Sequence, residues 1–165
     1  MTIAISEAVV IQNPVMGATT LFTFARAYFD ARNQERGPTL PDAMLVLPMA
    51  FHRRTAEAIH RMKSSSGLGK ALMDAPELPA GLQERVEGYS RVSLTSLDTA
   101  VAAGILCVDA DYPWPRYTPT RRTLPAAAVS SSLDVKTILA AAKRLGWWFA
   151  NEDSDAVYSL LGVRF

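Results

Sequence analysis

The clearest pattern of hydrophobic and polar positions lies in the C-terminal part of the chain. Apolar residues recur there at three- and four-residue spacing, and they form the stripe Val135, Ile138, Leu139, Ala142, Leu145 and Phe149. This predicts an amphipathic helix capped by Ser132 or Asp134. A short second helix is expected to begin after Asp153 or Ser154 and to end at Gly162. Because the stripe needs a covering surface, we expect the C-terminus to be docked in a core.

Two adjacent tryptophans, Trp147 and Trp148, lie in the first of these predicted helices. Neighbouring residues on a helix point about 100° apart, so the two side chains cannot both face the same core. Tryptophan is also among the residue types that anchor protein interfaces. We therefore expect one of the two to contact a partner protein.

The N-terminal part predicts a helical core over residues 13–104. Asn13 is a good N-cap and Pro14 suits the first helical position, so a long aromatic helix is expected to begin here. It is expected to end in the polar run between residues 30 and 37.

A continuously apolar segment follows at residues 43–51, and its lack of a polar face indicates a place at the centre of the core. Pro48 argues against a central strand because it cannot donate a ladder hydrogen bond. We therefore expect a helix that is kinked or restarted at Pro48 and that runs on to Met62.

Serines and glycines at residues 64–69 are expected to end that helix, with one or two helical turns to Met73 after them. Apolar residues from Leu82 to Val101 then keep the helical period. Because serine and threonine can cap helices, this long helix could be broken near residues 93–96 before it ends at Gly104.

A β-hairpin is predicted next. Residues 105–108 are β-branched and apolar, residues 109–115 are rich in turn formers, and residues 117–122 can return as the partner strand. A linker of small residues over 124–132 then leads to the terminal helices.

These elements predict a single domain over residues 1–165. It consists of a helical core (13–104), a hairpin and loop (105–131) and C-terminal helices (132–165). The expected fold class is therefore mainly α with a small β-hairpin, an α+β arrangement. The order of helix, glycine, hairpin and helix is also compatible with a winged-helix-like arrangement.

Composition narrows the functional classes. Hydrophobic residues make up 49% of the chain and charged residues 20%. This composition excludes an intrinsically disordered chain, and it is more apolar than expected for a protein that works as a free monomer. A surface buried against a partner would account for this. The net charge of +1 provides no global field for nucleic acid or a membrane, so such contact would need a local patch.

Cellular location is inferred from cysteine content and hydropathy. Cys107 is the only cysteine, which fits a reducing cytoplasm and excludes an internal disulfide. The N-terminus lacks a basic region before its apolar residues, and no stretch reaches the ~18 uninterrupted apolar residues of a membrane span. We therefore expect a soluble, cytoplasmic protein.

Residues 64–71 come close to the phosphate-binding loop G-x-x-x-x-G-K-[ST]. The match fails because Ser64 replaces the first glycine and Ala71 replaces the magnesium-binding hydroxyl. No clear strand leads into the loop either. Its glycines are better explained by a turn.

Other catalytic or metal-binding patterns are also weak. His52 and His60 share a helical face, but no third ligand completes a metal set nearby. The acidic cluster at residues 152–155 is explained by the dipole of the last helix, and Cys107 in an apolar strand is a poor nucleophile. We therefore expect no cofactor, no metal and no enzymatic activity.

Cationic and aromatic residues gather in the hairpin region, namely Trp114, Arg116, Tyr117, Arg121 and Arg122. This combination suits phosphate contact and base stacking. The same residue types are enriched in protein interfaces. A solvated loop, a partner contact and a DNA contact therefore all stand as interpretations.

Several segments form a set that extends over most of the chain: Asn13-Pro14, Leu45 to Pro48 with His52, Ser66 to Leu68, Gly104 to Leu106, Ala141 to Gly146 with Trp148-Phe149, and Val157-Tyr158 with Leu160 to Val163. In these segments the chain resembles the middle component of bacterial three-component ABC systems, which include relatives of Lamassu-type antiphage defence. The last two groups are the most specific. The loop from Asp109 to Leu124 does not match the family pattern, so its role stays open.

The resemblance implies a non-enzymatic adaptor that bridges an SMC-like coiled-coil ABC ATPase and an effector subunit, with DNA contact through the complex. Candidate interface residues are Trp147, Trp148, Trp114 and Tyr117. A free winged-helix DNA-binding regulator is the alternative. A neighbouring gene for a coiled-coil ATPase would distinguish the two functions.

Overall fold

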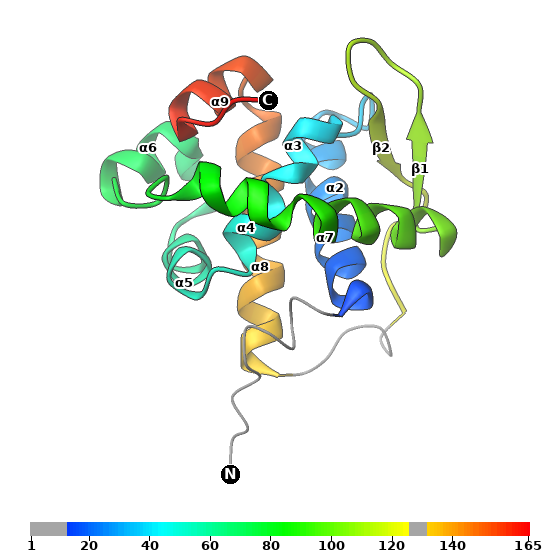
Figure 1. The fold of residues 1–165 in the computed structure, drawn as a ribbon, viewed down its shortest axis with the longest axis horizontal. Helices are drawn as coiled ribbons and strands as arrows, with labels where there is room; N and C mark the ends of the chain where they lie inside the picture. The colour runs from blue at the N-terminus through cyan, green and yellow to red at the C-terminus, as the bar shows by residue number, and fades with distance from the viewer. Residues whose placement is uncertain (1–12, 126–131) are drawn as a thin grey trace.

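The computed structural model describes residues 13–125 and 132–165, so most of the expected 124–132 linker lies outside the described residues. The described part is mainly helical with one small hairpin, which confirms the expected fold class (Figure 1). Its elements are α2 (Pro14–Ala31), α3 (Leu40–Met44), α4 (Val46–Ala50), α5 (Arg53–Arg61), the 3-10 turn η1 (Ser64–Ser66), α6 (Gly67–Asp74), α7 (Leu82–Ala102), β1 (Leu106–Asp109), β2 (Arg116–Pro119), α8 (Leu133–Ala150) and α9 (Ser154–Leu161).

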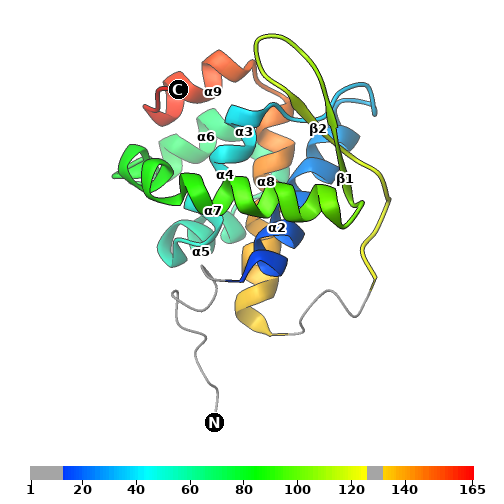
Figure 2. The ribbon, with the colours of Figure 1, turned by 45° about the vertical axis from the view of Figure 1, so that its right-hand side comes forward.

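Helices α2 and α8 form the central pair, and α8 runs through the middle of the molecule in both views (Figure 1, Figure 2). Gly146 permits their close approach, since a Cβ at this position would lie 2.4 Å from the carbonyl oxygen of Phe24 and 2.9 Å from the Cβ of Ala27. The rings of Phe24 and Phe149 then meet edge to face, with centroids 5.7 Å apart. The apolar stripe predicted in the C-terminal helix is covered mainly by α2.

Two of the helix starts predicted from capping residues are confirmed with their side-chain hydrogen bonds. The Asn13 side chain accepts from the backbone N–H of Val15 at 3.0 Å, and α2 begins at Pro14. The Ser132 hydroxyl accepts from the backbone N–H of Val135 at 3.3 Å at the start of α8. Local hydrogen bonding therefore fixes where the central pair begins.

A helix restarts beside Pro48, as expected, because α3 ends at Met44 and α4 begins at Val46. Pro48 is the third residue of α4, where its missing N–H would have no intrahelical partner in any case. The expected continuation to Met62 is wrong, because the chain leaves the helical conformation at His52 and α5 begins at Arg53. The apolar segment around Pro48 is nevertheless buried at the centre of the core, as expected.

The break expected near residues 93–96 is also wrong, because α7 is continuous from Leu82 to Ala102. Ser93 and Ser96 are fully buried, and Ser96 lies against Gly17 of α2. Small side chains allow the two helices to pack closely, which outweighs the tendency of serine to interrupt helices.

The C-terminal helix α9 is docked on the body. Its apolar residues Val157 and Leu161 are buried, as is Val163 beyond it. Gly162 adopts the left-handed conformation with a φ of 66° and ends the helix as expected. The C-terminus is therefore part of the core.

Asp42 of α3 joins α9 to the body through hydrogen bonds. Its buried carboxylate accepts from the Tyr158 hydroxyl at 2.8 Å and from the Ser154 hydroxyl at 3.3 Å. It also accepts from the backbone N–H of Thr39 at 3.1 Å, as part of a capping box. Burial, together with the negative charge of Asp42, raises the pKa of Tyr158. The Tyr158 hydroxyl therefore stays protonated and donates at neutral pH.

The Gly146→Ala substitution should lower the free energy of unfolding by about 1–3 kcal/mol, because the added methyl group meets backbone atoms of α2 that cannot move aside. Gly88→Ala in α7 is the matched control. A Cβ there meets nothing within 4 Å, so this change should be neutral or stabilising by up to ~1 kcal/mol. Urea denaturation of both variants measures the difference, and equal stabilities would contradict the close approach of α2 and α8.

The Tyr158→Phe substitution should lower the free energy of unfolding by about 1–3 kcal/mol, since it leaves a buried carboxylate short of one donor. Ser159→Ala, on the exposed side of the same helix, should have little effect. Thermal unfolding of the two variants is the measurement. If both variants have the same melting temperature as the unmutated chain, the hydrogen bond to Asp42 does not hold α9.

Candidate partner-binding surfaces

The hairpin is hydrogen-bonded to the helical body along β2. The pairing of β1 and β2 is antiparallel and confirms the predicted hairpin, although the returning strand ends at Pro119 instead of residue 122. The edge of β2 that faces away from β1 bonds to the body. The backbone N–H of Tyr117 donates to the carbonyl oxygen of Pro38 at 2.9 Å, and the backbone N–H of Leu40 donates to the carbonyl oxygen of Pro115 at 2.9 Å. Strand β2 thus has neighbours on both sides. These bonds attach the loop end of β2 to the body.

Gly37 allows the body to approach β2 this closely. A Cβ at Gly37 would lie 2.2 Å from the carbonyl oxygen of Tyr117. The same glycine offers its own carbonyl oxygen to the guanidinium of Arg116, at 2.9 Å from Nη1. Gly37 therefore joins both the backbone and a side chain of β2 to the body.

Arg116 also fixes the loop at the far end of the hairpin. Its Nε donates to the Asp111 carboxylate at 2.7 Å. The hydrogen bond from Arg116, followed by that from the backbone N–H of Tyr112, lowers the pKa of Asp111. Burial would lower the pKa of Arg116, but the hydrogen bond and charge of Asp111 outweigh it and the pKa is raised. Both groups are thus charged at neutral pH.

The loop between β1 and β2 projects from the body (Figure 1), and it carries exposed aromatic side chains. Tyr112 is 93% exposed and Trp114 is 41% exposed. We call these two residues the aromatic tip. Tyr117 is buried in the core instead, so it is not accessible to a partner, contrary to the expectation for this residue. Its side chain is drawn inward because β2 alternates half-buried and buried positions.

The three arginines of this region do not form one cationic patch. The guanidinium of Arg116 is engaged by Asp111 and Gly37 and is not free for phosphate. Arg121 and Arg122 are exposed beyond the end of β2. A nucleic-acid contact by these two residues stays a prediction.

The two adjacent tryptophans of α8 have different environments. Trp148 is fully buried, and its indole N–H donates to the carbonyl oxygen of Ser64 at 3.1 Å. Trp147 is 42% exposed. Trp148 therefore cannot reach a partner from the folded chain, and only Trp147 of this pair is accessible.

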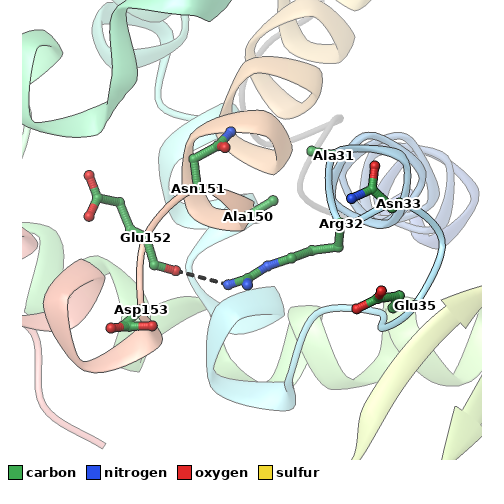
Figure 3. Close-up of a pocket in the computed structure, with 8 residues that line it drawn as sticks. All are labelled: Ala31, Arg32, Asn33, Glu35, Ala150, Asn151, Glu152 and Asp153. Carbon is green, nitrogen blue, oxygen red and sulfur yellow. Dashed lines mark hydrogen bonds between the residues drawn. The ribbon is translucent and has the colours of Figure 1, made fainter.

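A polar cleft of about 460 Å³ opens where the C-terminal ends of α2 and α8 meet (Figure 3). Arg32 reaches across it and donates to the carbonyl oxygen of Glu152 at 3.2 Å. This places a positive charge at the negative ends of two helix dipoles, where it stabilises both. The other charged lining residues carry carboxylates, namely Glu35, Glu152 and Asp153. The lining residues include no thiol and no imidazole, so we interpret the cleft as a joint between the two helices.

The sequence segments considered for chemistry have structural explanations. Lys70, in the near match to a phosphate loop, pairs with Asp74 at 3.1 Å. His52 shares a hydrogen bond of 2.7 Å with Thr55, and His60 is exposed. Over residues 13–125 and 132–165, no group of three metal-ligating side chains is placed to hold an ion. In the same residues, no helix combines the length and apolarity needed to cross a membrane.

Comparison with known protein families identifies the family of the chain. A family model described as ABC-three component (ABC-3C) system Middle Component 3 matches residues 3–165. The chain belongs to this family. The resemblance to middle components of three-component ABC systems is thereby confirmed, whereas the narrower likeness to Lamassu stays a prediction. No curated protein and no solved structure matches the chain.

Two features of this middle component were not predicted from its sequence. The Asp111–Arg116 ion pair has no local sequence signature, because two residues of opposite charge in a loop can also face solvent. Asp42 was detectable in principle, since Thr39 and Asp42 have the spacing of a capping box. Its further contacts with α9 depend on the tertiary fold.

The Arg116→Ala substitution should loosen the aromatic tip of the middle component without unfolding its helices. The backbone amides of residues 110–112 and of Trp114 should exchange with solvent several-fold faster, because Asp111 and Gly37 lose their common donor. Hydrogen exchange with mass spectrometry is the measurement, and Arg122→Ala is the control. Because the pKa of Asp111 is lowered, acidification below the ordinary Asp value of about 3.9 should loosen the unmutated tip in the same way. Unchanged exchange in Arg116→Ala would show that the ion pair does not order the tip.

Proposed function

We propose that this middle component is a non-enzymatic adaptor. It bridges an SMC-like coiled-coil ABC ATPase and an effector subunit in a cytoplasmic antiphage complex of the Lamassu type. The family match over residues 3–165 supports a role within a three-component ABC system. The bridging role is supported by the placement of exposed aromatic side chains.

Exposed aromatic residues on two separate elements carry this proposal. Tyr112 and Trp114 form the tip of the hairpin, and Trp147 lies on α8. Tyrosine and tryptophan are the side chains that most often dominate the binding energy of protein interfaces. A bridging protein needs at least two contact surfaces, and these residues supply one on the hairpin and one on the helical body.

The alternative function, a free winged-helix DNA-binding regulator, has less support. The helix that precedes the hairpin would enter a groove of the DNA, and here that helix is α7. Phosphates attract cations and repel carboxylates. The charged residues exposed on α7 are Glu84, Glu87, Asp98 and Arg91. Carboxylates therefore outnumber guanidinium groups on the surface that DNA would approach. DNA contact through Arg121 and Arg122 remains part of the adaptor proposal, within the assembled complex.

Loss of either aromatic surface should remove one partner. When the chain is expressed with its genomic neighbours, Trp147→Ala should weaken retention of one neighbour by about 2 kcal/mol or more, roughly 30-fold in affinity. The double variant Tyr112→Ala/Trp114→Ala should weaken retention of a neighbour through the hairpin. The measurement is an affinity pull-down that quantifies each neighbour.

Met73→Ala is the matched control, since Met73 is 83% exposed on α6, apart from both surfaces. Circular dichroism should establish that every variant is folded. Full retention of all neighbours by both aromatic variants would exclude these residues from the interfaces. If the unmutated chain retains no neighbour, the adaptor proposal fails and the free regulator becomes the better interpretation.

A further inference from the structure

One face of α8 remains exposed on the side opposite the core. At 100° per residue, seven residues lie within about 60° of the direction of Ala140. We call this set the α8 outer face. It consists of Leu133, Lys136, Thr137, Ala140, Lys143, Arg144 and Trp147. All are exposed or half-buried, whereas the buried residues of α8 lie on its other sides.

The outer face is basic, although the chain as a whole has a net charge of only +1. It carries three cations, while the nearest acidic residue of the helix, Asp134, points about 120° away from Ala140. Arg144 is tied to the body, since its Nε donates to the carbonyl oxygen of Met62 at 2.6 Å. Lys136 and Lys143 are exposed and form no ion pair with another described residue. Their charges are therefore available to a partner.

The shape of this face is also specific. Two large apolar side chains, Leu133 (77% exposed) and Trp147 (42% exposed), stand near its ends. They are 14 positions apart, which corresponds to about 21 Å along the helix. Between them in this row lie the small residues Thr137 and Ala140 and the half-buried Arg144. The alternating three- and four-residue spacing along this row is the spacing by which one helix packs against another.

We propose that the α8 outer face binds an acidic amphipathic helix of a partner protein. The apolar row of that helix lies over Ala140, between the side chains of Leu133 and Trp147. Its carboxylates flank the row and face Lys136 and Lys143. The inference goes beyond the proposed adaptor function, because it specifies the chemistry of the bound segment and holds for whichever protein carries it.

Charge and shape favour an acidic helix over DNA and over an anionic membrane surface as the partner of the α8 outer face. The outer surface of duplex DNA is lined by phosphates, and its apolar parts, the thymine methyl groups and base faces, lie inside the grooves or the base stack. They are a poorer match for the side chains of Leu133 and Trp147 than the continuous apolar row of a helix. A membrane surface favours a continuous apolar face that enters the acyl region, whereas here two large apolar residues are separated by small or polar ones. A helix with acidic flanks satisfies both the apolar ends and the basic residues.

The test uses the full chain and a synthetic probe peptide. The peptide is about three heptads long, with Leu at positions a and d and Glu at e and g. Binding is followed by fluorescence anisotropy of the labelled peptide, and peptide helicity by circular dichroism. Saturable binding with a gain of helicity is expected. Lys136→Glu/Lys143→Glu should weaken binding about tenfold or more, and Trp147→Ala should weaken it comparably.

Arg91→Glu, on the exposed side of α7, is the charge-matched control and should bind the probe as the unmutated chain does. A peptide with Lys at e and g should not bind. Equal binding by the Lys136→Glu/Lys143→Glu variant, or no binding of the acidic peptide, would overturn the inference. A third outcome would also overturn the inference: the unmutated chain binds duplex DNA or anionic vesicles but not the peptide, and the Lys136→Glu/Lys143→Glu variant loses that binding. DNA or a membrane would then be the partner of this face.

The outcome is separable from that of the adaptor proposal. If the peptide does not bind but the chain still retains its genomic neighbours, the inference fails and the adaptor function stands. If the peptide binds through Lys136 and Lys143 but no neighbour is retained, the adaptor function fails and the helix-binding face stands.

Discussion

The contact between α2 and α8 is the constraint on which the rest of this middle component depends. The absence of a side chain at Gly146 lets the two backbones meet at Phe24, and the aromatic rings above this point then pack. The opposite flank of α8 holds the next elements through two side chains. Arg144 donates to the carbonyl oxygen of Met62, and Trp148 donates to that of Ser64. The position of α8 against α2 thus also sets the connection between α5 and α6.

A second junction joins parts of the chain that are far apart in sequence. The segment at residues 37–40 pairs with β2 on one side and caps α3 on the other. Asp42, one turn further on, receives the hydroxyls of α9. The hairpin and the C-terminal helix are therefore attached to the same short stretch of backbone.

Local signals in the sequence were sufficient for the helices but not for their contacts. Asn13 and Ser132 mark helix starts because capping involves residues only two or three positions away. The serines of α7 misled the prediction, since packing in the core decides how such residues are used. The angle between Trp147 and Trp148 indicated that only one faces the core. Trp147 lies on the face of α8 opposite the predicted stripe, so the same geometry favours Trp148 for the core. The hydrogen bond from Trp148 to Ser64, in contrast, depends on the tertiary fold.

The hairpin illustrates the same limit and has a consequence for binding. Arg116 was a candidate for phosphate contact from its type alone, but Gly37 and Asp111, which engage it, lie at the body and at the tip of the loop. Because this arginine already holds the tip, Tyr112 and Trp114 are presented in a fixed arrangement before any partner arrives. In the proposed adaptor role, a partner that binds this tip would have little chain entropy to remove on association, and more of the contact energy of the two rings would be expressed as affinity.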